Sequence, residues 1–368
     1  MHLLVTLPVG GAEDLVAAMV TGLDPERFAM QAACIGPRGF IGEELTKAGF
    51  PVVSLGLDIK RTSAWRLVSE LRSLLKELQP DILHTHLYHP NFYGRLAALG
   101  MGLKGVVAQV HNTYTRVKFH RCLANYLLAF FTDRVLVGST QVWDDVRRYD
   151  RVAARRLQLI PYGIPLEELA VPATPEEAKA RLGVSGFVLG AVGRLEEQKG
   201  HEYLLAALPA LRREIDDLTV LLVGEGRRGD ALKQQARELG VEEVVHFLGT
   251  RRDLPWIYRA MDLYVQPSLW EGLSLAMLQA LGAGLPGVVT RVSGALGVVE
   301  DGVNGRLVPP GDSGALAAAI LELYRQPEVR QRLGERARRT ISEHYSLKAM
   351  LSQLEKLYLE LWEKGGGW

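Results

Sequence analysis

The sequence predicts an α/β protein with two Rossmann-like domains, each built on a doubly wound parallel sheet. Short apolar runs alternate with helical patterns along most of the chain, which is typical of repeated βα units. The alternation is interrupted at residues 160–165 and then starts again. At about 150 residues per domain, a chain of 368 residues is expected to hold two. The composition, 48% hydrophobic and 23% charged, is that of a globular α/β protein.

The first domain is expected to span residues 1–163. Its strands are predicted at residues 2–7, 28–35, 51–55, 81–86, 105–110 and 133–137. Residues 64–78 and 119–131 have the apolar spacing of amphipathic helices. Gly10 and Gly11 directly follow the first strand, where they allow a ligand to approach the backbone closely.

The second domain is expected to span residues 164–345. Its strands are predicted at residues 186–192, 218–223, 244–248, 262–266 and 287–290. Residues 327–364 form a long amphipathic pattern broken near Ser346, so residues 346–368 are predicted to be a separate helix. In open α/β sheets ligands bind beyond the carboxyl ends of the strands, so the two domains are expected to face a cleft.

A polar turn follows the strand at residues 262–266 and contains Glu271, Gly272, Leu273 and Ser274. Such a turn at a helix N-terminus presents backbone N–H groups and the positive end of the helix to an anion. Gln279 lies eight positions after Glu271, about two helical turns along. A phosphate-bearing ligand is expected here, the alternative being that Glu271 merely caps the helix.

A second turn follows the strand at residues 186–192 and carries Gly193, Arg194 and Lys199. A planar guanidinium and a compact ammonium beside a strand end can together clamp a diphosphate. The alternative is a pair of ordinary surface cations.

These two turns resemble the nucleotide-binding region of the retaining family 4 glycosyltransferases, which have the GT-B fold. The resemblance covers nearly the whole chain, and it rests on Pro267-Ser268, Glu271-Gly272, Gly284-x-Pro286 and Gly193-Arg194 followed by Lys199-Gly200. It implies transfer of a sugar, with retention, from a UDP- or GDP-sugar to an acceptor hydroxyl. UDP is the favoured nucleotide. The acceptor would attack from the leaving-group face and pass its proton to a donor phosphate oxygen, so no protein nucleophile is assigned.

The resemblance also implies roles for single residues. Arg194 and Lys199 would hold the diphosphate, Glu271 the sugar hydroxyls, and Gln279 the ribose, where most members carry Glu. Further positions that match the family's site are the loop glycines Gly10 and Gly11, the active-site histidine His111, and Gly249 beside the base.

Histidines cluster at the end of the fourth predicted strand. His84, His86 and His89 suggest a metal, but no nearby Asp, Glu or Cys completes a ligand set. His86 is therefore expected either to line the cleft or to be a satisfied structural histidine. The chain also lacks an Asp-x-Asp motif. The reaction is expected to need no metal and no cofactor, the nucleotide sugar being a co-substrate.

Two other functions stay open at this point. A GT-B pseudoenzyme that binds without turnover is suggested by Gln279, Gly287, Leu296-Gly297 and Tyr162, where the family usually has other residues. An NAD-dependent oxidoreductase is suggested by the Gly-x-Gly-x-x-Gly pattern at residues 224–229. The following strand, however, lacks the acidic residue that would bind the ribose.

The first domain has a basic excess, with 19 Lys and Arg against 14 Asp and Glu in residues 1–163. Arg116, Lys118 and Arg121 flank or begin the apolar stretch 119–131. This pattern favours an anionic membrane surface and a glycan or lipid-linked acceptor, although a solvated helix face is the alternative. Nothing predicts a nucleic-acid partner.

Cys34 and Cys122 form no ligand or disulfide motif, which indicates a reducing cytoplasm. We expect no signal peptide and no membrane-spanning helix. The predicted location is therefore cytoplasmic, with peripheral attachment to the inner face of the cell membrane.

Overall fold

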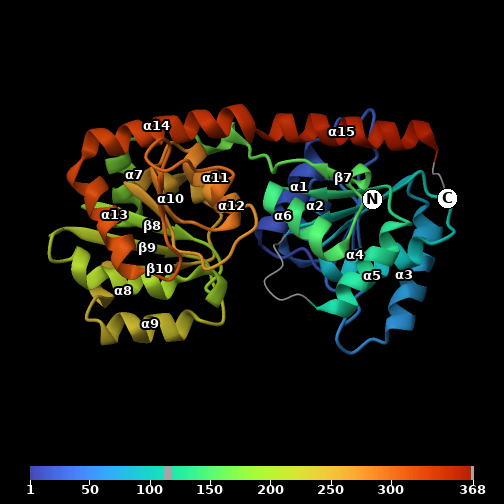
Figure 1. The fold of residues 1–368 in the computed structure, drawn as a ribbon, viewed down its shortest axis with the longest axis horizontal. Helices are drawn as coiled ribbons and strands as arrows, with labels where there is room; N and C mark the ends of the chain where they lie inside the picture. Colours follow the sequence, from blue (N-terminus) through green and yellow to red (C-terminus); the bar gives the residue numbers. More distant parts are fainter. Residues whose placement is uncertain (112–117, 366–368) are drawn as a thin grey trace. The chain divides into compact units, whose positions relative to one another are not determined.

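The computed structural model describes residues 1–111 and 118–365 (Figure 1). The chain forms two compact units. The N-terminal unit contains Met1–Gly163 and the C-terminal segment from Leu347, and the C-terminal unit contains Ile164–Ser346. Each unit holds one parallel sheet, which confirms the two Rossmann-like sheets expected from the sequence.

The sheet of the N-terminal unit has seven strands in the order β3-β2-β1-β4-β5-β6-β7. They are β1 (His2–Leu4), β2 (Ala32–Cys34), β3 (Val52–Ser54), β4 (Ile82–His86), β5 (Gly105–Val110), β6 (Arg134–Val137) and β7 (Leu157–Leu159). The winding direction reverses between β1 and β4, as in doubly wound folds. The edge strand β7 was not predicted, because it is only three residues long and follows an arginine-rich stretch.

Several strands are shorter than the apolar runs that predicted them. The first run continues to Leu7, whose carbonyl accepts a hydrogen bond from Ile41 N (2.9 Å) instead of pairing in the sheet. In the second run, Phe28 N donates to Asp24 O (2.9 Å) in a turn. An apolar run predicts that its residues are buried. Whether a buried residue also pairs in a sheet depends on the strands beside it.

Seven α-helices belong to the described part of the N-terminal unit. They are α1 (Gly11–Gly22), α2 (Gly39–Lys47), α3 (Ala64–Leu78), α4 (Tyr88–Ala98), α5 (Phe119–Ala129), α6 (Thr140–Asp145) and α15 (Leu347–Lys364). The C-terminal helix α15, red in Figure 1, contacts α1, β4 and β5. It buries Met350, Leu354, Leu357, Tyr358 and Leu361.

The sheet of the C-terminal unit has six strands in the order β10-β9-β8-β11-β12-β13, with the reversal between β8 and β11. They are β8 (Phe187–Val192), β9 (Leu218–Val223), β10 (Val245–Gly249), β11 (Leu263–Gln266), β12 (Gly287–Thr290) and β13 (Arg306–Val308). The helices are α7 (Pro175–Leu182), α8 (His201–Leu211), α9 (Gly229–Glu238), α10 (Leu254–Ala260), α11 (Leu275–Gly282), α12 (Ser293–Leu296), α13 (Ser313–Arg325) and α14 (Pro327–His344). Leu204 and Leu208 of α8 and Ile320 of α13 bury their side chains in one core with this sheet.

Candidate active site

Two polar turns lie side by side in the C-terminal unit. Gly193 and Arg194 follow β8, and residues 267–274 follow β11. β8 and β11 are hydrogen-bonded neighbours, and the winding direction of the sheet reverses between them. In doubly wound sheets this reversal leaves a crevice in which ligands bind. The topology therefore brings both turns to the ligand-binding end of the sheet.

Gly200 allows the two turns to approach closely. Its backbone has φ +61°, and a Cβ at this position would lie 2.1 Å from the carbonyl oxygen of Pro267. Any other residue would clash with backbone there, so glycine is required. Leu269 N also donates to Gln198 O (2.8 Å). These contacts hold Lys199 against the loop that carries Glu271.

Lys199 and Glu271 form an ion pair with Nζ 2.5 Å from Oε2, and their side chains are only 15% and 9% exposed. Gln198 Nε2 donates to Glu271 Oε1 (3.3 Å), and Ser268 Oγ donates to Oε2 (3.4 Å). Both carboxylate oxygens thus have donors. The alternative that Glu271 caps α11 is wrong, because the cap is Ser274, whose Oγ accepts from Met277 N (3.3 Å).

Directly before α11 are three backbone N–H donors, those of the buried residues Gly272, Leu273 and Ser274. Among the described residues, none of the three donates a hydrogen bond. Helix α12 supports this loop closely, since a Cβ on Gly294 would lie 1.4 Å from Gly272 O. Backbone donors of buried residues seldom lack an acceptor, which can be a ligand or water. The loop can therefore bind an anion through its backbone.

Arg194 is exposed, and within the described residues its guanidinium makes no hydrogen bond or ion pair. Beside it, His201 begins α8 and is buried. Burial first, and the positive charge of Lys199 second, lower the pKa of His201 to about 4. His201 is thus neutral near pH 7. Sequence reasoning assigned no role to His201, Gln198 or Ser268, although all three lie within or next to the motifs.

Gln279 and Gly249 lie elsewhere in the same unit. Gln279 Oε1 accepts a hydrogen bond from Tyr258 OH (3.2 Å), which leaves its amide NH₂ as a donor. Gly249 ends β10 with φ +65° and accepts from Gly224 N (2.8 Å). No hydrogen bond in the described chain joins either residue to the Lys199–Glu271 pair.

The remaining candidates belong to the N-terminal unit. Gly10 directly precedes α1, and Gly11 is the first residue of that helix. His86 ends β4 and His111 follows β5. His2 of β1 is in register with His84, and His86 is in register with Gln109. Residues in register point to the same face of a sheet, so these side chains gather on one face.

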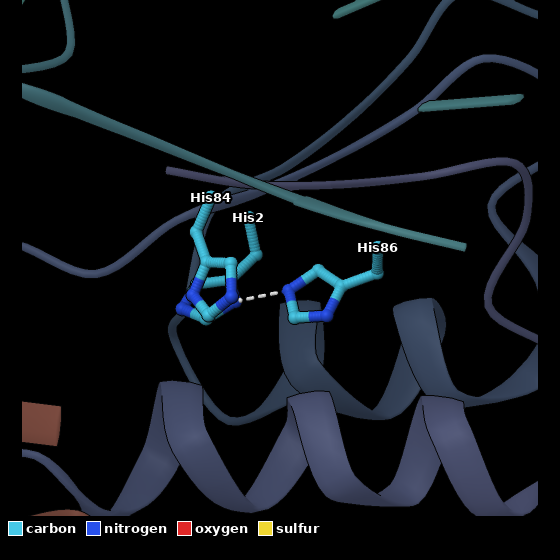
Figure 2. A group of neighbouring side chains, drawn as sticks. All are labelled: His2, His84 and His86. Carbon is cyan, nitrogen blue, oxygen red and sulfur yellow. Dashed lines mark hydrogen bonds between the residues drawn. The ribbon is translucent and has the colours of Figure 1, made fainter. Parts of the chain in front are cut away.

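Buried histidines and tyrosines on this face form a hydrogen-bonded chain. Its links are Tyr162 OH to His111 Nδ1 (2.9 Å), His111 Nε2 to His86 Nδ1 (3.2 Å), His86 Nε2 to His2 Nδ1 (2.8 Å), His2 Nε2 to Tyr358 OH (3.3 Å) and Tyr358 OH to His84 Nδ1 (2.6 Å). Figure 2 shows the His2–His86 link as a dashed line. Burial is the main cause that lowers the pKa of all four histidines, that of His111 to about 4. All four are neutral near pH 7.

The grouping of His89 with His84 and His86 was wrong. His89 lies on α4 and packs on Tyr88 and Tyr93, and the third member of the cluster is His2. Nitrogens of His2, His84 and His86 lie within 4.8 Å of one another. The His84 and His86 rings, however, are stacked, with their centroids 4.3 Å apart and their planes at 27°. Imidazole lone pairs lie in the ring plane, so stacked rings do not point at one metal ion.

Comparisons with known proteins agree with this architecture. Residues 9–168 match the family described as "Glycosyltransferase Family 4", and residues 186–326 match "Glycosyl transferases group 1". The chain is 27% identical over 353 residues to the UDP-Gal:alpha-D-GlcNAc-diphosphoundecaprenol alpha-1,3-galactosyltransferase of Escherichia coli, covering 92% of this chain and 91% of that protein. It is 30% identical over 307 residues to the D-inositol 3-phosphate glycosyltransferase of Saccharomonospora viridis, covering 76% and 70%.

Among solved structures, Anabaena HepE in complex with UDP and glucose has a TM-score of 0.86 to this chain at 23% identity. The match covers 97% of this chain and 98% of that one. This likeness concerns the fold. Together with the sequence relatives, it rules out the oxidoreductase alternative that the glycine pattern at residues 224–229 suggested. The chain belongs to the family 4 glycosyltransferases and is an enzyme of the GT-B type.

Proposed function

We propose that the protein transfers a sugar from a nucleotide-diphosphate sugar, with UDP the favoured nucleotide, to an acceptor hydroxyl with retention of configuration. The observation that carries this proposal is the donor set between β8 and β11. It combines the guanidinium of Arg194, the ammonium of Lys199, which is paired with Glu271, and the backbone N–H groups of the buried residues Gly272, Leu273 and Ser274. A diphosphate supplies the matching negative charge and acceptor oxygens.

The same groups would assist the departure of the sugar. As the bond between the anomeric carbon and the phosphate oxygen breaks, negative charge grows on the diphosphate. Arg194 and the N-terminus of α11 stabilise that charge, and they are already in place before the reaction. The acceptor oxygen forms the new bond on the same face, and its proton passes to a donor phosphate oxygen. No protein nucleophile and no metal ion is required in this scheme.

Glu271 and Gln279 would orient the donor. A carboxylate has about four acceptor positions, so Glu271 can accept from sugar hydroxyls while it holds Lys199 and Gln198. Tyr258 occupies the oxygen of Gln279, and the amide NH₂ of Gln279 would then donate to the ribose. Gly249 would lie beside the base, and Gly10, Gly11 and His111 would contribute from the N-terminal unit.

The acceptor is proposed to be a lipid-linked glycan intermediate at a membrane surface. Apart from His120, the exposed side chains on and just after α5 are aromatic or aliphatic: Phe119 (79%), Leu123 (46%), Tyr126 (38%), Leu127 (53%), Phe130 (51%) and Phe131 (46%). Lys118 is also exposed beside them, whereas Arg116 lies outside the described residues. An apolar face with flanking cations fits an anionic bilayer surface. The Escherichia coli relative is named for a diphosphoundecaprenol-linked acceptor.

No helix in the described parts of the chain has the length and apolar character to cross a bilayer. The attachment that we propose is peripheral, through the exposed face of α5 and residues 130–131.

A thermal-shift screen against UDP-, GDP- and ADP-sugars tests the donor assignment. A ligand that binds the native state raises the midpoint of unfolding by mass action, so we expect UDP-sugars to give the largest increase. A transfer assay with the stabilising donor, followed by NMR of the product's anomeric proton, tests retention. No stabilisation by any of the three classes would contradict the proposal.

A further inference from the structure

The turn between β4 and α4 lies at the ligand-binding end of the N-terminal sheet. β4 ends at His86 and α4 begins at Tyr88, and the winding direction of this sheet reverses between β1 and β4. Ligands of doubly wound sheets bind beyond the carboxyl ends of the strands at such a reversal. The intervening residue, Leu87, has φ +65° and ψ 175°. Residues other than glycine rarely adopt this conformation, and those that do are concentrated at functional sites.

Hydrogen bonds to the sheet hold the first turn of α4 in place. Asn91 is 5% exposed, and its Oδ1 accepts from Thr85 Oγ1 of β4 (2.6 Å). Its Nδ2 donates to Gln109 O of β5 (2.9 Å), and its backbone N donates to Leu87 O (3.1 Å). The start of α4 is therefore fixed by two strands, as a binding site on a rigid element requires.

Four aromatic rings lie on the first two turns of α4 and form what we call the α4 aromatic cluster: Tyr88, His89, Phe92 and Tyr93. All four residues are partly exposed. The rings of Tyr88 and Phe92 are nearly parallel with centroids 6.3 Å apart, and those of His89 and Tyr93 are nearly parallel at 6.4 Å. In the described part of the chain, the two phenol oxygens and the nitrogens of the His89 ring have no hydrogen-bond partner. The cluster therefore offers both apolar ring faces and polar groups to a ligand.

Arg121 adds a positive charge beside this cluster. It lies in the first turn of α5, which is a neighbour of α4 (Figure 1), and its Cζ is 4.0 Å from the centroid of the Tyr88 ring. Its guanidinium makes no hydrogen bond or ion pair with any described residue. A guanidinium that packs on a ring keeps its N–H groups for an anion. Burial first, and the charge of Arg121 second, lower the pKa of His89, so its ring is mostly neutral at pH 7 and both donates and accepts.

A sugar that carries a phosphate matches these groups. The C–H faces of a pyranose ring pack on aromatic rings, and its hydroxyls both donate to and accept from phenol and imidazole groups. A phosphate matches the guanidinium, which can bind two phosphate oxygens at once. A glycosyltransferase has to bind an acceptor as well as a donor, and the donor set described above lies in the C-terminal unit.

We propose that the α4 aromatic cluster and Arg121 bind the acceptor, through a pyranose ring on the aromatic faces and its attached phosphate on the guanidinium. This inference deepens the proposed function and rests on it for the role of the bound molecule as acceptor. The binding of a sugar phosphate at this place follows from the side chains themselves.

NMR titration of the full chain tests the site. We would label the tyrosine rings with ¹³C, assign one signal with Tyr88→Phe, add excess UDP to fill the donor site, and titrate with glucose 1-phosphate. The signals of Tyr88 and Tyr93 should shift with one common Kd. Inorganic phosphate and methyl α-glucoside, which each carry half of the probe, should bind at least tenfold more weakly. The proposal is wrong if either of them, or uridine 5′-monophosphate with its stacking base, binds to these rings as tightly as glucose 1-phosphate.

Two variants on different helices measure the two parts of the site. Arg121→Ala should raise the Kd for glucose 1-phosphate about tenfold, because charge-assisted hydrogen bonds to the phosphate are lost. Phe92→Leu keeps an apolar side chain but removes a ring face, and it should raise the Kd about fivefold. The matched controls are Arg155→Ala, at an exposed position of the same unit, and Trp362→Leu, at a tryptophan 56% exposed on α15. Neither control should change the Kd.

A wild-type Kd in folded Arg121→Ala or in folded Phe92→Leu would overturn the proposal, and if one variant fails to fold the other still decides. The titrations contain no sugar donor and measure no turnover, so their result is separate from that of the transferase assay. Binding at α4 without any nucleotide-sugar binding would contradict the proposed function alone. Transfer without a shift of the Tyr88 and Tyr93 signals would contradict the α4 site alone.

Discussion

Lys199 Nζ lies 2.5 Å from Glu271 Oε2, and this ion pair joins two turns that are 72 residues apart in the sequence. Both side chains are largely buried, and Gln198 and Ser268 donate to the same carboxylate. A buried pair of this kind is costly to break, because removing one partner leaves an unpaired charge inside the protein. The pair therefore links the stability of the C-terminal unit to the geometry of the site.

Arg194→Ala and Lys199→Ala are expected to separate activity from stability. Each variant should lower kcat by a factor on the order of 10²–10³, since each removes a cation from the leaving diphosphate. Arg194→Ala should keep the wild-type free energy of unfolding, because Arg194 is exposed. Lys199→Ala should lose about 3–5 kcal/mol, because Glu271 is left unpaired. Steady-state kinetics measure kcat, and urea unfolding measures the free energy of unfolding.

The double variant Lys199→Met with Glu271→Gln removes both charges, and we expect it to regain most of the stability but not the activity. Arg213→Ala, an exposed arginine elsewhere on the C-terminal unit, is the control for loss of a positive charge. Wild-type turnover by Arg194→Ala would disprove its proposed role.

Transfer is expected to survive chelation. Arg194, Lys199 and the backbone donors of residues 272–274 supply the positive charge that a divalent ion supplies in metal-dependent transferases. Initial rates should therefore be the same with and without excess EDTA, and added Mg²⁺ or Mn²⁺ should change them little. A loss of activity in EDTA that Mn²⁺ restores would show that the metal-free scheme is wrong.

Gln279→Glu is expected to tighten nucleotide binding. The carboxylate would accept from a ribose hydroxyl in place of the amide NH₂ that donates to it. Hydrogen bonds to charged groups contribute more than neutral ones, by about 1 kcal/mol, so the Kd for the nucleotide should fall roughly fivefold. The ribose is remote from the reacting carbon, so kcat should change much less. Calorimetric titration decides the matter, with Gln234→Glu, an exposed glutamine on α9, as control. Equal affinity in wild type and Gln279→Glu would place Gln279 outside the ribose site.

Leu127→Glu is expected to weaken binding to vesicles that contain anionic lipid. Burying one leucine side chain in an apolar environment contributes about 1.5–3 kcal/mol. The affinity for the vesicles, measured by sedimentation, should therefore fall at least tenfold. Trp65→Glu is the matched control, because Trp65 is 86% exposed on α3, outside this face. Equal sedimentation of wild type with and without anionic lipid would argue against the membrane surface.

Stability is expected to fall as the pH drops below about 6.5. Burial lowers the pKa of His111 from 6.5 to about 4, and it lowers those of His2, His84 and His86 as well. Between pH 4 and pH 6.5 the unfolded chain therefore binds more protons than the folded one. The contribution of these histidines to the free energy of unfolding is complete above pH 6.5 and is lost toward pH 4. His111 alone contributes about 3 kcal/mol over that range.

Urea unfolding at pH 7.5, 6.5 and 5.5 measures this slope. The variant His111→Gln should show a shallower dependence than wild type, whereas His344→Gln, at an exposed position, should match wild type. A free energy of unfolding that stays constant from pH 7.5 to 5.5 would contradict the expectation.

The sequence by itself determined those features that depend on neighbouring residues. The helix α3 has the predicted bounds, since Ser63 caps it and its apolar residues repeat at helical spacing. The sequence likewise predicted that strands end before Gly193 and Pro267, because at each place a short apolar run stops at turn-forming residues. The break between α14 and α15 also appeared as an interruption of one amphipathic pattern. Local propensity and periodicity suffice for such features.

Only the tertiary structure decided which distant residues meet. Because β8 and β11 are neighbours in the sheet, Lys199 forms an ion pair with Glu271, and the residue that caps α11 is Ser274. In the N-terminal unit, strand register brings His2 beside His84, and α15 adds Tyr358 from the other end of the chain. No local pattern encodes these contacts, because they arise from long-range pairing of elements whose own sequences are compatible with many neighbours. The hydrogen-bonded chain to His111 is for this reason a property of the fold.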